Sequence, residues 1–177
     1  MLDQPTYDPT AVAPLRKELH DVGFADLSTS SEVDIALEAQ GTAFLVLNSV
    51  CGCSAGSARP GVCAALQNDR IPDRLVALFA GQEKSAVAHL RSRFLAGHAP
   101  SSPNIALFQD GELVLLLERK DIQGMDPESI AARLRDAFDK ICSRPGPSVS
   151  PEDYAGLEHA LACGSTMPRT DGTPGSC

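Results

Sequence analysis

Tryptophan is absent from this chain of 177 residues, and two tyrosines and six phenylalanines are its only aromatic residues. Single-stranded nucleic acids are bound largely by stacking bases on aromatic side chains, for which this sequence has little material. Basic residues are also in the minority, since 15 Lys and Arg stand against 23 Asp and Glu, and the net charge is −8. A protein this acidic repels phosphate backbones and anionic lipids, so neither nucleic acid nor a membrane is expected as a partner.

Long apolar runs and a recognisable targeting signal are lacking as well. No stretch reaches the roughly 18 consecutive apolar residues that a membrane-spanning helix needs. Residues 1–10 carry neither the basic start nor the apolar centre of a secretory signal peptide. We therefore expect a cytoplasmic protein, in a compartment that keeps thiols reduced.

Six cysteines stand out in a sequence of otherwise ordinary globular composition, with 43% hydrophobic and 21% charged residues. A chain of this length can bury enough apolar surface to fold without disulfides or metals. The cysteines also lack the even spacing of a secreted disulfide framework, so catalysis or metal binding becomes the question that they raise. They are Cys51, Cys53, Cys63, Cys142, Cys163 and Cys177.

Hydrophobic periodicity predicts alternating helices and strands. Pro14 falls near the first turn of the first helix, Thr29 begins a capping box ahead of the second, and Pro60-Gly61 should kink the third. Asp126-Pro127 is a typical helix start, and Asp110-Gly111 between two apolar runs predicts a hairpin. The expected helices cover residues 12–22, 29–37, 55–66, 87–97 and 126–141, and the expected strands cover 43–47, 75–80, 105–108 and 113–117.

Parallel strands joined by helices, with an antiparallel hairpin added, give a mixed sheet with helices on both faces. This order predicts an α/β protein with a thioredoxin-like fold over residues 1–142. Residues 143–177 differ in composition, with five Pro, five Gly and one helical stretch at 154–162. They are expected to form a flexible C-terminal tail.

The motif Cys51-Gly52-Cys53 lies where the strand at 43–47 gives way to a helix. Unpaired N–H groups and the positive end of the helix dipole favour a thiolate at such a place, and the thiolate is the species that attacks disulfides. Arg59, about two turns on, is the nearest cation, and the sequence alone assigns it no role. The position predicts a thiol–disulfide redox site.

One residue separates Cys51 from Cys53, where the familiar redox motif has two. A disulfide between them closes a very small ring, for which the permitted geometry is narrow. Gly52 should help, because glycine accepts backbone angles that other residues resist. We therefore expect a bond that is readily reduced and hence functional.

Two other classes of function compete with this reading. A C-x-C pair can clamp Zn or Cu(I) in a metal-binding module, although such sites usually need two further ligands. The four histidines are scattered without ligand spacing, so no metal site is assigned. An acidic scaffold is the third class, and it predicts that replacing Cys51 has no effect.

The second informative feature is Ser102-Pro103, just before the strand that starts at Ile105. Proline is tolerated at the start of a strand for steric reasons alone. Only about 5–6% of X–Pro bonds are cis, so the local sequence favours a trans bond. The position in a thioredoxin-like order favours the opposite, a cis bond against the cysteine motif that exposes backbone to a thiol substrate.

The remaining cysteines carry weaker expectations. Cys63 should be a small buried hydrophobe on the third helix. Cys142 ends the last helix, where an incidental exposed thiol is favoured over a secondary exchange partner. Cys163 and Cys177 lie in the tail, where they are candidates for oxidation, intermolecular disulfides or a resolving thiol.

From Tyr7 to Cys142, the sequence closely resembles the bacilliredoxin family of thioredoxin-like proteins. The segment running into the C-G-C pair, with S-S-P about 50 residues later, is its specific signature. The matching stretches are 48–53 (NSVCGC), 58–60 (ARP), 66–69 (LQND), 76–82 (VALFAGQ) and 100–103 (PSSP).

The resemblance implies an enzyme that removes bacillithiol from mixed disulfides on client proteins. Cys51 then resembles the nucleophile that takes up the small thiol, and Cys53 the cysteine that resolves the adduct. Gly52, Ser102 and Pro103 would position the substrate. The implied partners are S-thiolated client proteins and bacillithiol or a similar small thiol, which acts as co-substrate with no further cofactor. General disulfide reductase or isomerase activity is the alternative.

Overall fold

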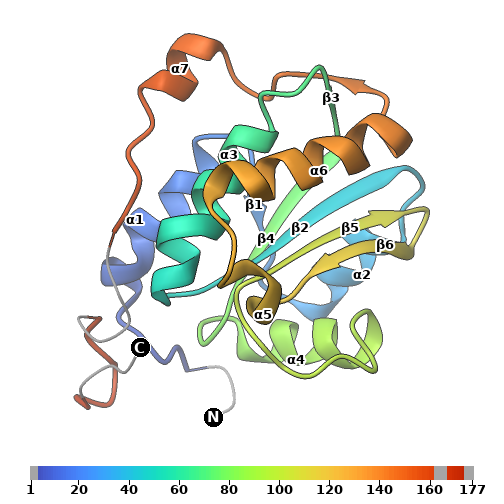
Figure 1. Cartoon of the computed structure of the whole chain (residues 1–177). Coiled ribbons are helices and arrows are strands. Elements are labelled where there is room, and N and C mark those ends of the chain that lie inside the picture. Colours follow the sequence, from blue (N-terminus) through green and yellow to red (C-terminus); the bar gives the residue numbers. More distant parts are fainter. Residues whose placement is uncertain (1–3, 162–166, 174–177) are drawn as a thin grey trace.

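The computed structural model describes residues 4–161 and 167–173, and its centre is a five-stranded sheet in the order β1-β4-β2-β5-β6 (Figure 1). Strands β1, β4 and β2 run parallel, whereas β5 and β6 are antiparallel to their neighbours. All seven residues of β2 are buried, as expected for the central strand. The strands are β1 (Ala25–Asp26), β2 (Thr42–Asn48), β4 (Arg74–Phe79), β5 (Asn104–Gln109) and β6 (Glu112–Leu117).

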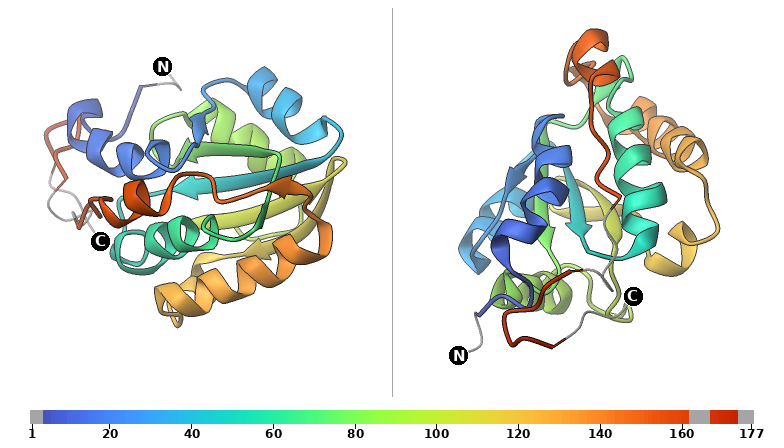
Figure 2. Two further views of the ribbon diagram at one scale, coloured as in Figure 1. Left: turned by 90° about the horizontal axis from the view of Figure 1, so that it is seen from above. Right: turned by 90° about the vertical axis from the view of Figure 1, so that its left-hand side faces the viewer.

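Helices cover both faces of this sheet, and each face has its own apolar core (Figures 1 and 2). Helices α3 (Arg59–Ala65) and α6 (Pro127–Ile141) pack on one face, where the end of α1 (Pro9–His20) adds Leu19. Helices α2 (Ser30–Glu38) and α4 (Lys84–Arg93) pack on the other. The predicted thioredoxin-like mixed sheet with helices on both faces is confirmed.

Local signals in the sequence acted as predicted at three turns. The Thr29 side chain accepts from the Glu32 N–H, and the Glu32 side chain bonds back to Thr29, which completes the capping box before α2. Asp126 accepts from the Ser129 N–H at 2.7 Å and so caps α6. Asp110 and Gly111 turn the β5–β6 hairpin with φ angles of 51° and 87°.

Two prolines lie elsewhere in their helices than expected. Helix α1 begins at Pro9, so Pro14 is inside the helix and not in its first turn. The helix after the cysteine motif starts as a π-helical turn, Ser54–Ala58, and Pro60 falls in the first turn of α3. Because Pro60 has no N–H, the ladder cannot continue regularly across it, and the Arg59 N–H bonds back to the Ser54 carbonyl. The irregularity therefore precedes Pro60.

Helices α3 and α6 approach each other closely at Gly61. A Cβ atom placed there would lie 2.8 Å from the Ile130 Cβ and 2.9 Å from the Pro127 carbonyl oxygen. Gly61 is buried, so no side chain could turn away into solvent. The absence of a side chain at Gly61 is what lets the two helices pack at this distance.

The segment after α6 contacts the domain at several points. Strand β7 (Arg144–Pro145) pairs with β3 (Arg70–Ile71), and Met167 is buried against α1. The helix expected at 154–162 is wrong: α7 spans Pro151–Ala155 and Gly156 follows its end. The division of the chain at residue 142 and the flexibility of residues 143–177 stay predictions. No helix among the described residues is long and apolar enough to cross a membrane.

Candidate functional site

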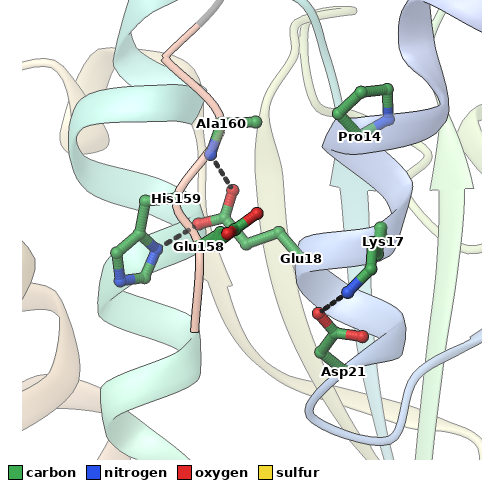
Figure 3. A pocket seen from close by; sticks show the side chains of 7 residues that line it. All are labelled: Pro14, Lys17, Glu18, Asp21, Glu158, His159 and Ala160. Atoms are coloured by element: carbon green, nitrogen blue, oxygen red, sulfur yellow. Dashed lines mark hydrogen bonds and ion pairs between the residues drawn. The ribbon is translucent and has the colours of Figure 1, made fainter. Parts of the chain in front are cut away.

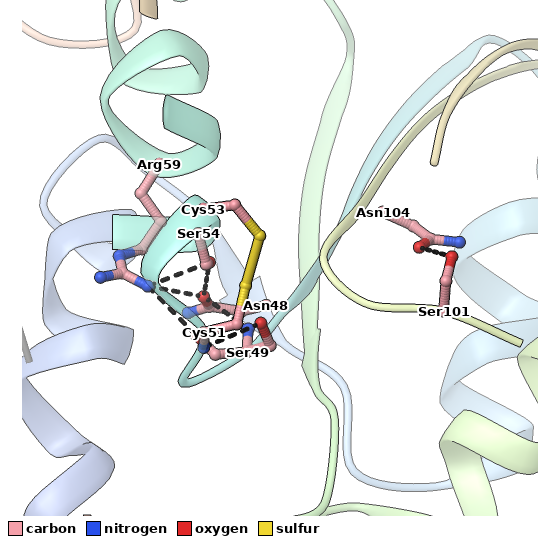
Figure 4. Close-up of a disulfide and its surroundings, with 8 residues drawn as sticks. All are labelled: Asn48, Ser49, Cys51, Cys53, Ser54, Arg59, Ser101 and Asn104. Atoms are coloured by element: carbon pink, nitrogen blue, oxygen red, sulfur yellow. Dashed lines mark hydrogen bonds between the residues drawn. A yellow bond between two sulfur atoms is a disulfide. The ribbon is translucent and has the colours of Figure 1, made fainter. Parts of the chain in front are cut away.

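Cys51 and Cys53 lie where β2 ends and the next helix begins, and their sulfur atoms form a disulfide (Figure 4). The Cys51 carbonyl oxygen accepts from the N–H groups of Ser54 at 3.0 Å and Ala55 at 3.3 Å, which places Cys51 at the helix N-terminus. Once the disulfide is reduced, this position favours a thiolate on Cys51 through the unpaired N–H groups and the helix dipole. The geometry is that of a thiol–disulfide exchange site.

Gly52 differs from its sequence-based interpretation. Its φ angle does not lie in the left-handed region, and an added Cβ would meet nothing within 4 Å. The conformational reason proposed for glycine is therefore wrong in this disulfide state. What Gly52 provides is open space on the exposed side of the two cysteines.

A pocket of about 270 Å³ opens beside Cys51, and Ser102 lies on its wall. The Ser102–Pro103 bond is cis, as predicted, and Pro103 is buried behind Ser102 at the start of β5. Cys51 is 8% exposed, whereas Cys53 packs partly buried against the α3–α6 core. The structure thus brings Cys51 and Ser102 to one pocket from positions 51 residues apart. The other described residues that line it are Thr6, Tyr7, Ser49, Val50, Ala80, Gly81 and Arg119.

A buried charged cluster lies directly behind the cysteine motif (Figure 4). Arg59 and Glu18 are both fully buried, and the Arg59 Nε lies 2.7 Å from Glu18 Oε2. The Arg59 Nη1 donates to Asn48 Oδ1 at 3.1 Å, to the Ser49 carbonyl at 3.3 Å and to Ser54 Oγ at 3.0 Å. One guanidinium therefore joins the end of β2 to the first turn of the helix.

The same cluster reaches the backbone of Cys51 through its serine and asparagine members. Asn48 Oδ1 accepts from the Ser49 N–H at 2.9 Å and from Ser54 Oγ at 3.0 Å. Ser49 Oγ in turn accepts from the Cys51 N–H at 3.3 Å. Charge and hydrogen bonds together hold the turn in place.

Sequence reasoning missed both charged members of this cluster. Arg59 received no role, and Glu18 was not considered. A signal for Glu18 was present, because it falls on the apolar stripe of α1 between Leu15 and Leu19, where a charged residue must find a buried partner. No pattern in the sequence pairs Glu18 with Arg59.

The cysteines outside the motif are buried where the structure describes them. Cys63 is fully buried, as predicted, and burial raises its pKa far above that of an ordinary thiol. The expectation of an exposed Cys142 is wrong: the residue is 4% exposed, and burial against the α6 core raises its pKa to about 11. Cys163 and Cys177 lie outside the described residues.

Metal ligands were the main alternative for the cysteine pair. Across residues 4–161 and 167–173, no group of three or more His, Cys, Asp or Glu side chains is placed to hold a metal ion. Three histidines instead pair with carboxylates at 2.9 Å or less: His20 with Asp26, His89 with Asp34 and His159 with Glu18.

Comparisons with known proteins identify the family of the chain. A family model described as disulphide isomerase matches residues 7–142. A bacilliredoxin of Halalkalibacterium halodurans is 48% identical over 132 residues, 74% of this chain and 91% of the relative. Bacilliredoxins of Shouchella clausii and Salinibacter ruber are 46% and 43% identical, covering 75% and 80% of this chain and 92% and 83% of the relatives. A solved structure described as an oxidoreductase with a thioredoxin fold covers 66% of this chain and 96% of its own, with 19% identity and a TM-score of 0.47.

The family model spans residues 7–142, the part of the chain in which the cysteine pair, Arg59 and the cis proline lie. Identity above 40% across nine-tenths of a relative's length leaves the family in no doubt. The chain belongs to the bacilliredoxin family and is a thiol–disulfide oxidoreductase.

Proposed function

We propose that this protein removes bacillithiol from mixed disulfides on client proteins in the cytoplasm. The observation that carries the proposal is the pocket beside Cys51, which Ser102 lines and next to which Cys53 lies. A client disulfide could enter this pocket with its small-thiol half next to Cys51. The backbone at Ser102 would position the client disulfide, and the open space at Gly52 would leave room for it.

The reaction follows from the two thiols and balances without a further cofactor. The Cys51 thiolate attacks the bacillithiol sulfur, so that a Cys51–bacillithiol disulfide forms while the client's disulfide bond breaks and the client leaves as a thiolate. The Cys53 thiolate then attacks the Cys51 sulfur, which releases bacillithiol and forms the Cys51–Cys53 disulfide described above. A thiol reductant must supply two electrons to restore the dithiol.

Charge in the pocket supports an acidic small thiol as the group removed. Of the described residues that line the pocket, Arg119 alone carries a charge. Its neighbour Lys120 lies 2.7 Å from Glu118, whereas Arg119 makes no ion pair with a described residue. An unpaired guanidinium is suited to a carboxylate, and bacillithiol carries carboxylates.

A general disulfide reductase or isomerase is the second candidate, and the description of the matching family model favours it. The two candidates differ in their substrate. The second predicts comparable turnover on ordinary protein disulfides when no bacillithiol is present, whereas the first predicts turnover that depends on the bacillithiol adduct.

The test uses Cys53→Ser protein and a client carrying a bacillithiol disulfide. Without the resolving thiol, we expect the adduct to remain on Cys51, visible as the mass of one bacillithiol in an intact mass spectrum, with the client released. Cys51→Ser should acquire no adduct. The matched control adds Cys63→Ser to the Cys53→Ser protein and should keep the adduct on Cys51, because Cys63 is buried. A Cys53→Ser protein that stays unmodified while the client keeps its adduct would contradict the proposal.

A further inference from the structure

Residues 157–161 run between α1 and α3, and Glu158, His159 and Ala160 line a pocket against α1 (Figures 2 and 3). His159 Nδ1 lies 2.6 Å from Glu18 Oε1. The Ala160 N–H donates to Glu18 Oε2 at 3.3 Å, and the Ala160 carbonyl accepts from Arg59 Nη2 at 2.8 Å. The segment thus contacts both members of the buried ion pair, although it lies beyond residue 142, where the family match ends.

These contacts complete the hydrogen bonding of two fully buried charges. Arg59 uses its other donors on Glu18 and on the turn that carries Cys51, which leaves Nη2 for Ala160. Glu18 Oε1 has His159 as its partner from the segment. A buried charge that loses a partner is strongly destabilised, so the ion pair depends on the segment being in place.

A separate contact, from Met167 further along the chain, reaches the residue next to the cysteine motif. Met167 is 5% exposed and packs in an apolar cluster with Val50, the residue before Cys51. Val12, Leu15 and Phe79 complete this cluster. Residues beyond position 142 therefore reach the turn with the cysteines both through Arg59 and through Val50.

We propose that residues 157–161 are part of the redox site, with His159 as a positioning residue that sets the reactivity of Cys51 through Glu18 and Arg59. The inference rests on the proposed role of Cys51 as the attacking thiol. His159 draws the negative charge of Glu18 toward the segment. The positive charge of Arg59 is then less neutralised at the turn, where it favours the Cys51 thiolate.

The experiment measures alkylation of Cys51 by iodoacetamide against pH in full-length Cys53→Ser protein, followed by mass. Adding His159→Ala should raise the apparent pKa of Cys51 and slow alkylation about fivefold below that pKa, the size of one ordinary hydrogen bond, because His159 acts on Cys51 only through Glu18 and Arg59. His159→Asn places a donor where Nδ1 stood and should restore the profile. His89→Ala removes another histidine–carboxylate pair, on the opposite face of the sheet, and should change nothing.

Glu18→Gln separates this electrostatic role from a merely structural one. Removing the carboxylate charge leaves Arg59 unopposed, so the apparent pKa of Cys51 should fall, opposite to the effect of His159→Ala. Shifts in the same direction for both variants, or a rapidly alkylated Cys51 that ignores His159, would overturn the inference and leave the proposed function standing. A Cys51 no faster than an ordinary thiol in every variant would overturn the proposed function and the inference with it.

Discussion

Arg119 combines two properties that single it out among the residues near Cys51. It is partly exposed on the pocket wall, and its charge has no ion-pair partner among the described residues. Next to it, Lys120 is 76% exposed by side chain and is already paired with Glu118. Arg119 is thus free to pair with a negatively charged substrate, whereas the adjacent Lys120 is already paired, and substitutions of the two can be compared.

We expect Arg119→Gln to slow exchange with a bacillithiol-capped peptide about fivefold, mainly through KM, because an exposed charge contact contributes about 1 kcal/mol. The same peptide capped with cysteamine, a cationic thiol, should react no more slowly. Lys120→Gln is the matched control and should leave both rates unchanged. Equal losses on both substrates would assign Arg119 a role unrelated to substrate charge.

Cys142 makes stability depend on alkaline pH. Burial raises its pKa from 9.0 to about 11, so the folded state keeps the thiol protonated in a range where the unfolded chain ionises. Its contribution to stability is complete below pH 9 and is lost as the pH rises toward about 11. Cys142→Ala should therefore destabilise the protein by an amount that shrinks between pH 9 and 11, measured by urea unfolding at each pH. A difference that stays constant with pH would contradict this.

Contacts between residues close in the sequence were predictable for single residues, whereas contacts between residues far apart in the sequence were not. Thr29 and Asp110 bond to backbone within a few residues, and the chemistry of such contacts can be read locally. Glu18 and Arg59 are 41 residues apart, and nothing local indicates that they meet. The buried position of Cys142 likewise depends on distant packing.

The contact between α3 and α6 shows how one element constrains another. Gly61→Ala would place a Cβ 2.8 Å from Ile130, and the two helices would have to move apart. We expect a loss of about 1–3 kcal/mol in the free energy of unfolding, the usual effect of overpacking a core. Urea unfolding monitored by circular dichroism measures it.

Gly56→Ala provides the matched control on the preceding π-helical turn. A Cβ there meets nothing within 4 Å, and the residue is exposed. Its free energy of unfolding should stay within about 0.5 kcal/mol of the parent protein or rise slightly, since alanine restricts the unfolded chain. Equal losses at both positions would show that backbone freedom, and not the approach of α6, explains Gly61.

Helices and strands were predictable where the sequence carries a continuous apolar run or a helix cap. The apolar run at 43–47 became β2 and the Asp126 cap began α6 at Pro127. The helix expected at 154–162 failed because residues 157–161 are held by the Glu18–Arg59 pair in a non-helical path. Short elements such as α5 (Arg119–Ile122) carry too few residues for a periodic signal.

The whole molecule carries a net charge of −8, while the pocket carries the positive charge of Arg119. The overall field acts over distances comparable to the Debye length, about 10 Å at 0.1 M salt, and Arg119 acts at contact. The net charge should therefore affect how fast client proteins approach, and Arg119 should affect how the small thiol binds in the pocket.

We expect a basic bacillithiol-capped peptide to react faster than an acidic one of equal length at 20 mM ionic strength. The ratio of the two second-order rate constants should fall toward one at about 0.5 M salt, because the field is then screened. Stopped-flow rates at several salt concentrations measure it. A ratio that does not change with salt would show that local contacts, not net charge, select clients.

The two ends of the described chain meet beside the pocket. Tyr7 bridges to Arg169, Thr170 bonds to the Thr6 carbonyl, and Thr6 and Tyr7 line the pocket of Cys51. An affinity tag or fluorescent partner fused at either end would be tethered a few residues from the reacting sulfur and could shield it from large clients. The tip of the β5–β6 hairpin, at Asp110, lies at the opposite end of β5 from Ser102 and is the better place for a label.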